Sequence, residues 1–166
     1  MIITDFDNTL VNTLQAAKDH SDVFISKFNP WNKEIFKHKN KKIISHDVTT
    51  MERLATNKKY KMNKVIRYMI DVLRDRDITI ITMRPKLELF IVKELFPEFN
   101  IKEIHDGMTI ESKVEYIHEN NPKYYFEDDS RVLTKINRKV KTKLFVPIHY
   151  FNKRDVYSDR RYSIIE

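Results

Sequence analysis

The 166-residue sequence contains no cysteine and only one glycine, Gly107, and both shortages restrict what the protein can do. Without cysteine the chain forms no disulfide, no thiolate metal site and no cysteine nucleophile, which favours a cytoplasmic location. With one glycine it carries neither a P-loop nor a dinucleotide-binding fingerprint, since both need several glycines. Any bound phosphate must therefore be held by side chains, by backbone amides at turns, or by a metal ion.

Long hydrophobic runs are also missing. No window approaches the roughly 18 consecutive apolar residues of a membrane-spanning helix, so we expect no membrane segment. The first basic residue is Lys18, so no basic stretch precedes an apolar one, and we expect no signal peptide. The hydrophobic content of 41% is still sufficient for one folded domain with a core.

The charge is basic overall. The net charge is +7, and lysines cluster at 37–42 and 58–61. Two interpretations stay open. A basic surface attracts a polyanion or a phosphorylated substrate, whereas a run of charges more often lies on a solvated face without any partner.

β-branched and aromatic runs alternate along the chain with segments of helical periodicity. Strands are predicted at the start of the chain and at 78–82, 101–105, 124–126 and 144–148. Helices are predicted at 62–73, 87–96, 112–119 and 132–136. This alternation predicts an α/β fold, a three-layer, Rossmann-like parallel sheet.

Two prolines refine the prediction of helices and strands, and one segment gives no prediction. Pro85 suits the start of the second helix. Pro147 cannot donate a sheet hydrogen bond, so it predicts that the last strand lies at an edge. The segment 150–166 shows no pattern that predicts an element.

Polar side chains follow the predicted strands where each one ends. The first strand ends in Asp5 and Asp7, the second in Thr82, and the fourth in the acidic run 127–129. Lys113 lies at the start of the helix before that fourth strand. Because ligands of open α/β sheets bind beyond the carboxyl ends of the strands, we expect these groups to form one site.

This set of groups is suited to phosphoryl transfer. A carboxylate can attack phosphorus and form an aspartyl-phosphate, which divides hydrolysis into two steps. Attack of an anion on an anion requires positive charge, and Mg²⁺ prefers hard oxygen ligands such as carboxylates and phosphate oxygens. An ammonium and a hydroxyl would stabilise the phosphoryl group, and a second carboxylate would serve as general acid and base.

The chain resembles the haloacid dehalogenase (HAD) superfamily of phosphohydrolases. The matching motifs, in order, are Asp5-Phe6-Asp7-Asn8-Thr9, Thr82, Lys113 and Asp128-Asp129, and the resemblance spans roughly residues 1–148. It implies that Asp5 is the nucleophile and that Asp7 is the general acid and base. It also implies a Mg²⁺ cofactor.

The resemblance implies roles for the remaining residues as well. Thr82 and Lys113 would hold the transferring phosphoryl group. The metal ligands would be Asp5, Asp7, Asp128 and Asp129, with Asp128 favoured among the last acidic residues because the strand ends at Phe126. Which member of 127–129 touches the metal stays open. Thr9 and Arg84 are further candidates for substrate contact, although Arg84 could equally be a surface residue.

The spacing between the first two motifs predicts an insertion. Far more residues separate Asp5 from Thr82 than a βαβ unit of about 30 residues needs. We therefore expect a core of 1–13 and 62–166, and a small, mostly helical insertion at 14–61. By the family resemblance this insertion is a C1-type cap, which would close over the site and select the substrate.

We expect a phosphorylated small molecule as substrate, with a nucleotide first among the candidates. Two alternatives stay open. Removal of terminal phosphates from DNA or RNA is favoured by the basic charge and by the Thr82-Met83-Arg84 pattern, which resembles polynucleotide 3′-phosphatases. The third possibility is a binding protein with a HAD fold that holds phosphate without turnover. The oligomeric state is not predicted.

Overall fold

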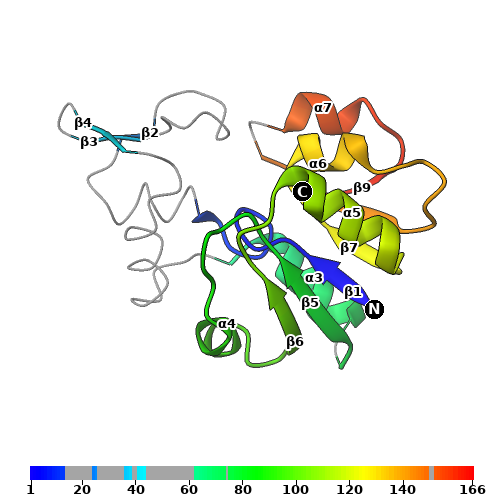
Figure 1. Cartoon of the computed structure of the whole chain (residues 1–166), viewed down its shortest axis with the longest axis horizontal. Coiled ribbons are helices and arrows are strands. Elements are labelled where there is room, and N and C mark those ends of the chain that lie inside the picture. The colour runs from blue at the N-terminus through cyan, green and yellow to red at the C-terminus, as the bar shows by residue number, and fades with distance from the viewer. Residues whose placement is uncertain (14–23, 26–35, 39–40, 44–61, 74, 150–151) are drawn as a thin grey trace.

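The computed structural model describes residues 1–13, 24–25, 36–38, 41–43, 62–73, 75–149 and 152–166, and a six-stranded sheet lies at its centre (Figure 1). The strand order is β6-β5-β1-β7-β8-β9. The strands are β1 (Ile2–Thr4), β5 (Asp77–Ile81), β6 (Asn100–His105), β7 (Tyr124–Phe126), β8 (Lys143–Pro147) and β9 (Tyr162–Ile165). All neighbouring pairs are parallel, which confirms the predicted Rossmann-like α/β sheet.

Helices cover both faces of the sheet, so the fold has three layers (Figure 1). One apolar cluster joins the sheet to α3 (Lys64–Leu73) and α4 (Leu89–Leu95). The other joins it to α5 (Ile110–Asn120), α6 (Ser130–Lys135) and α7 (Lys153–Tyr157). None of the described helices is both long and apolar enough to cross a bilayer.

The central strands are apolar on both sides because both of their faces are covered. Ile2 of β1 packs in the cluster of α3 and α4, whereas its neighbour Ile3 packs in the cluster of α5, α6 and α7. In β5, Ile80 packs in the cluster of α3 and α4, and Ile81 packs in the cluster of α5, α6 and α7. Successive side chains of a strand point to opposite faces, so a buried parallel strand reads as a continuous hydrophobic run.

The prediction that Pro147 marks an edge strand was wrong. β9 pairs with β8 from Leu144 and Tyr162 to Pro147 and Ile165, so β9 is the edge. Pro147 is tolerated because it is the last residue of β8, and its carbonyl accepts a hydrogen bond from Asn152 Nδ2 at 3.0 Å. The segment 150–166, for which no element was predicted, therefore contains both α7 and β9, the sixth strand of the sheet.

The helix predicted to start at Pro85 begins at Leu89 instead. The connection before it is tied to the loop after β6, where the Gly107 N–H donates to the Arg84 carbonyl at 2.7 Å. Gly107 has φ 63, in the left-handed region that favours glycine. This bond holds the connection in a non-helical path and fixes Arg84 beyond the end of β5.

Only three short strands are described within the expected insertion at 14–61. They are β2 (Phe24–Ile25), β3 (Phe36–His38) and β4 (Lys41–Ile43), and they form an antiparallel sheet. The described part of this segment is thus strand, where helix was expected. The rest of 14–61 lies outside the described residues, as does the lysine cluster at 58–61.

Candidate active site

The candidate site lies at the point where the strand order reverses. From β1 the chain builds β5 and β6 on one side and then β7, β8 and β9 on the other, and such switch points form the binding crevices of open α/β sheets. Asp5 directly follows β1, and its N–H donates to the Phe126 carbonyl at 2.8 Å. The carboxyl ends of β1 and β7 are therefore bonded side by side, and their polar residues meet.

Three carboxylates and one ammonium group form the centre of the site. Carboxylate oxygens of Asp5, Glu127 and Asp128 lie within 4.8 Å of one another. Lys113 Nζ donates to Asp5 Oδ1 at 2.6 Å and to Glu127 Oε2 at 2.8 Å. All four side chains are buried. The sequence prediction that Asp5, Lys113 and Asp128 come together is reproduced by this geometry.

A capping box places Lys113 at this centre. The Ser112 N–H donates to Thr109 Oγ1 at 3.1 Å, and the Thr109 N–H donates to Ser112 Oγ at 2.9 Å. These reciprocal bonds fix the first turn of α5. Lys113 is the next residue of that turn, so its side chain is directed by the start of the helix rather than by a flexible loop.

The buried cluster holds three acidic side chains and one ammonium group. Burial, together with the neighbouring Glu127 and Asp7 carboxylates, raises the pKa of Asp5 to about 8, although Lys113 opposes the shift. Burial and the neighbouring carboxylates also raise the pKa of Asp128 well above its ordinary value. Burial by itself would lower the pKa of Lys113, but Asp5 and Glu127 outweigh it, and that pKa is raised. The centre therefore favours an additional cation.

One carboxylate oxygen of the cluster has no hydrogen-bond partner among the described residues. Asp128 Oδ1 accepts a hydrogen bond from Thr9 Oγ1 at 3.0 Å, but buried Oδ2 has no hydrogen-bond partner among the described residues. Buried polar atoms normally have a partner. Asp5 and Asp128 offer carboxylate oxygens, the ligand type that Mg²⁺ prefers. These residues fit a bound Mg²⁺.

Glu127 is the most fully bonded carboxylate of the cluster. Its Oε1 accepts the N–H groups of Asp128 and Asp129, both at 3.1 Å. Its Oε2 accepts from Lys113 Nζ and from the Tyr125 hydroxyl. With both oxygens engaged, Glu127 orders the loop after β7 and orients Lys113, while Asp128 keeps one oxygen without a hydrogen-bond partner among the described residues.

Asp129, also considered as a metal ligand, points elsewhere. Its Oδ1 accepts from the Arg131 N–H at 2.8 Å and caps α6, and its Oδ2 accepts from Arg131 Nη2 at 2.9 Å. The structure groups Asp5 with Glu127 and Asp128 and leaves Asp129 outside this group.

Asp7 forms a second, more open part of the site. Arg84 donates from Nε to Asp7 Oδ2 at 3.0 Å and from Nη2 to Oδ1 at 2.5 Å. Thr13 Oγ1 donates to the same Oδ1 at 2.5 Å. The Asp7 side chain is 21% exposed, whereas that of Arg84 is 2% exposed. Arg84 is therefore a buried partner of the second carboxylate, not a surface residue.

Thr82 lies at the matching end of β5. It is buried, its N–H donates to the His105 carbonyl at 2.9 Å, and its Oγ1 accepts from the Arg84 N–H at 3.1 Å. The hydroxyl thus turns the chain so that the Arg84 side chain faces Asp7. Among the described residues this hydroxyl donates no hydrogen bond of its own.

Sequence reasoning missed the residues that hold the loop after Asp7. The Asn8 carbonyl accepts from Asn63 Nδ2 at 2.7 Å and lies 2.6 Å from His149 Nε2. Asn8 has φ 60, a left-handed conformation that asparagine tolerates better than most residues. Burial lowers the pKa of His149. No sequence signal links His149 to Asn8, because the two meet only through the fold.

Comparison of the chain with protein-family models, with curated proteins and with solved structures finds no match.

Proposed function

We propose that the protein is a Mg²⁺-dependent phosphomonoester hydrolase that works through an aspartyl-phosphate on Asp5, as its resemblance to the HAD superfamily implies. The proposal is carried by Asp128 Oδ2, a buried oxygen without a hydrogen-bond partner among the described residues, in the cluster that also holds Asp5. When bound there by Asp5 and Asp128, Mg²⁺ would neutralise charge on the phosphoryl group.

In the first step, an oxygen of Asp5 attacks phosphorus and the bond from phosphorus to the ester oxygen breaks. The leaving alcohol oxygen takes its proton from Asp7. Lys113, which lies 2.6 Å from Asp5, supplies a fixed positive charge beside the reacting oxygens. The Thr82 hydroxyl donates a hydrogen bond to the phosphoryl group.

In the second step, water attacks phosphorus of the aspartyl-phosphate, and Asp7 accepts the proton of that water. The bond between phosphorus and Asp5 breaks, which releases inorganic phosphate and restores the Asp5 carboxylate. Asp7 must therefore alternate between donor and acceptor without moving away. Its two bonds from Arg84 fix its position, while its partial exposure leaves it open to water.

For the substrate, we propose a phosphorylated small molecule, with a nucleotide first among the candidates. The alternative of terminal phosphates on DNA or RNA rests on the basic charge and on the Thr82-Met83-Arg84 pattern. In the structure Arg84 pairs with Asp7, and the oligonucleotides of the substrate panel test this alternative. A binding protein without turnover would hold phosphate at the same residues and is distinguished by activity.

The test is phosphate release from p-nitrophenyl phosphate with Mg²⁺, comparing the wild type with Asp5→Asn. The matched control is Asp71→Asn, the same change at an exposed position of α3. We expect magnesium-dependent turnover that Asp5→Asn lowers about a thousandfold or more and that Asp71→Asn leaves unchanged. A panel of nucleotides and of phosphorylated oligonucleotides then identifies the preferred substrate.

Trapping gives an independent readout of the chemistry. Acid-quenched wild type should carry phosphate labile to hydroxylamine, as an acyl-phosphate does, and Asp5→Asn should carry none. The protein could instead fold and bind Mg²⁺ but release no phosphate from any member of the panel. That result would contradict the hydrolase proposal and favour a phosphate-binding protein without turnover.

A further inference from the structure

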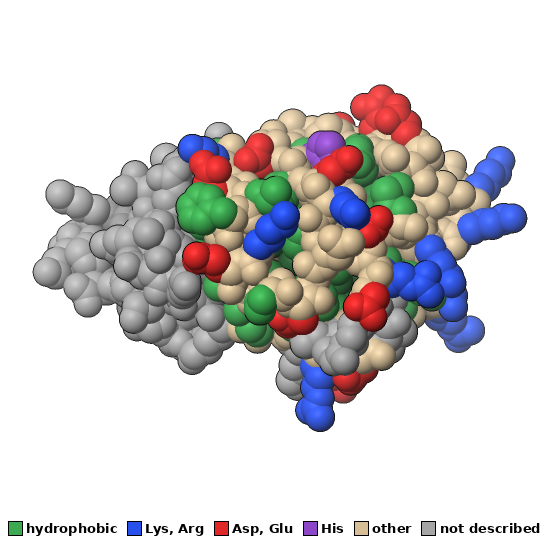
Figure 2. All heavy atoms as spheres, turned by 90° about the horizontal axis from the view of Figure 1, so that it is seen from below, with side chains coloured by type: hydrophobic (Ala, Val, Ile, Leu, Met, Phe, Trp, Pro, Cys, Tyr) green, Lys and Arg blue, Asp and Glu red, His purple; other side chains and the backbone are tan. Residues whose placement is uncertain are grey.

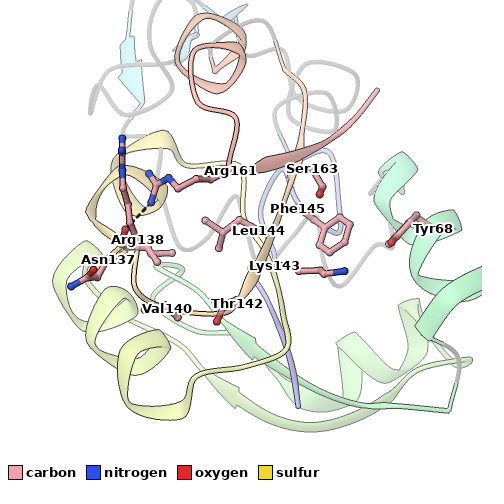
Figure 3. Close-up of a pocket in the computed structure, with 11 residues that line it drawn as sticks. Tyr68, Asn137, Arg138, Val140, Thr142, Lys143, Leu144, Phe145, Arg161 and Ser163 are labelled. Atoms are coloured by element: carbon pink, nitrogen blue, oxygen red, sulfur yellow. Dashed lines mark hydrogen bonds between the residues drawn. The ribbon is translucent and has the colours of Figure 1, made fainter.

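A second candidate site lies at the other end of the sheet. A groove with a volume of about 490 Å³ is bordered by α3, by the connection from α6 to β8, and by the first residues of β8 and β9 (Figure 3). The candidate active site follows the last residues of the strands instead. The groove reaches Phe145, whose carbonyl accepts the Glu127 N–H at 3.1 Å, but none of the carboxylates of the cluster lines the groove.

The groove is bordered by positive charge. The connection at 137–143 reads Asn-Arg-Lys-Val-Lys-Thr-Lys and holds four cations without an acid. Arg138, Lys143 and Arg161 line the groove, and none of the described residues that line it is acidic. Figure 2 shows lysine and arginine side chains gathered at the right-hand end of the molecule, where Figure 1 places this connection.

One of these cations is held in place by the protein itself. Arg161 Nη1 donates to the Ile136 carbonyl at 3.0 Å, and Arg161 also pairs with Asp159 at 2.7 Å. Asp159 thus offsets one positive charge next to the groove. Arg138 and Lys143 are exposed, and both contribute charge that the groove itself does not cancel.

Two aromatic rings and one unused hydroxyl complete the lining. The rings of Tyr68 and Phe145 lie 5.1 Å apart at one side of the groove, and Figure 3 shows Asn137 and Arg138 at the other. Thr142 Oγ1 is a buried atom with no hydrogen-bond partner among the described residues. A ligand that suits this lining offers a flat ring, a hydrogen-bonding group and several negative charges.

We infer that this groove binds single-stranded nucleic acid. Single strands are bound by positively charged grooves that follow the backbone and by aromatic side chains on which bases stack. The bases must be unpaired for a ring face to reach Tyr68, the half-buried ring of the pair, since Phe145 is buried and stacks on Phe126. A mononucleotide would use this ring and one cation, whereas the exposed Lys139 and Lys141 continue the charge beyond the groove, as a polyanion requires. This inference goes beyond the proposed function and does not depend on it.

The test measures binding without catalysis. A fluorescently labelled twelve-nucleotide oligo(dT) with hydroxyl ends is titrated with Asp5→Asn protein in EDTA, so neither a terminal phosphate nor a metal contributes. Arg138→Ala/Lys143→Ala is compared with Lys93→Ala/Lys102→Ala, which removes two exposed cations from α4 and β6. We expect the groove variant to weaken binding about tenfold or more and the control less than twofold.

Two further readouts separate the groove from general attraction. Removing two phosphate contacts should reduce the slope of log affinity against log salt concentration by about 1.4. Tyr68→Leu keeps an apolar side chain against Phe145, and it should weaken binding about fivefold while leaving that slope unchanged. Circular dichroism and thermal unfolding of each variant establish that it is folded.

Equal losses in the groove and control variants would overturn the inference, since binding would then follow net charge alone. Displacement of the oligonucleotide by submillimolar dTMP, but not by inorganic phosphate, would overturn it in favour of a small nucleotide ligand. Neither result bears on Asp5 chemistry, because the binding experiment contains no Mg²⁺ and no nucleophile.

Discussion

Arg84 holds Asp7 with two parallel hydrogen bonds, at 3.0 Å to Oδ2 and 2.5 Å to Oδ1, between residues that stand 77 positions apart in the chain. The guanidinium also lies 5.0 Å above the Phe6 ring, which restricts its movement. A planar donor pair bound to both oxygens fixes the orientation of a carboxylate as well as its position. In the proposed mechanism that orientation decides whether Asp7 can reach the leaving oxygen.

The first prediction concerns this pair. Arg84→Lys keeps the charge but loses the second donor, because an ammonium cannot replace a bidentate guanidinium. We expect kcat for a phosphomonoester to fall about 100-fold, with little change in KM and a shifted pH profile. Arg67→Lys, an exposed change on α3, serves as the control. An unchanged kcat and pH profile in Arg84→Lys would rule out a positioning role.

The second prediction concerns Lys113. Replacing it with Met leaves the Asp5 and Glu127 carboxylates buried without their ammonium partner, which should cost about 3–5 kcal/mol of unfolding free energy. Adding Asp5→Asn removes one of those charges, so the double variant should be more stable than Lys113→Met alone. Urea denaturation measures both values. Strictly additive effects would contradict the coupling between Lys113 and Asp5.

The third prediction is a pH dependence of the metal-free protein. The Asp5 pKa of about 8 lies above its ordinary value of 3.8, so between these values the folded state binds the proton more tightly than the unfolded state. Stability contributed by this proton is lost as pH rises towards 8. The pKa of His149 is lowered from 6.5, so this group contributes a slope of the opposite sign that fades above pH 7.

We therefore expect the Tm in EDTA to fall between pH 7 and pH 8, and to fall less in Asp5→Asn. Mg²⁺ should raise the Tm of the wild type and should do so more at pH 8, since metal binding competes with the proton. Scanning calorimetry at the two pH values measures this. A wild-type Tm that does not change with pH would show that the cluster is not protonated at neutral pH.

The fourth prediction distinguishes Asp128 from Asp129. Asp128→Asn should weaken Mg²⁺ binding, as measured by calorimetry, about 100-fold. Thr9→Val, which removes the donor to Asp128 Oδ1, should weaken it about tenfold. Asp129→Asn should keep Mg²⁺ affinity and cost little stability, because asparagine also caps a helix and only the ion pair with the partly exposed Arg131 is lost. The opposite order for Asp128 and Asp129 would place the metal at Asp129.

The sequence predicted much of the core correctly because buried strands and amphipathic helices have distinct periods. The predicted runs at 78–82 and 101–105 correspond to β5 and β6, and the predicted helix at 112–119 lies within α5. β9 was not predicted, because its sequence lacks such a clear pattern. As an edge strand, Tyr162–Ile165 is only partly buried, so it lacks the continuous apolar run that marked the inner strands.

What the sequence by itself determined is the order of the elements and the residues at their ends, since these depend on local patterns. It placed Asp5, Thr82, Lys113 and the acidic run 127–129 at one rim. Only the tertiary structure decided which of those residues meet. Adjacent side chains after a strand point in different directions, so Asp128 joins the cluster while Asp129 bonds Arg131. Their partners come from distant segments, and no local pattern records that pairing.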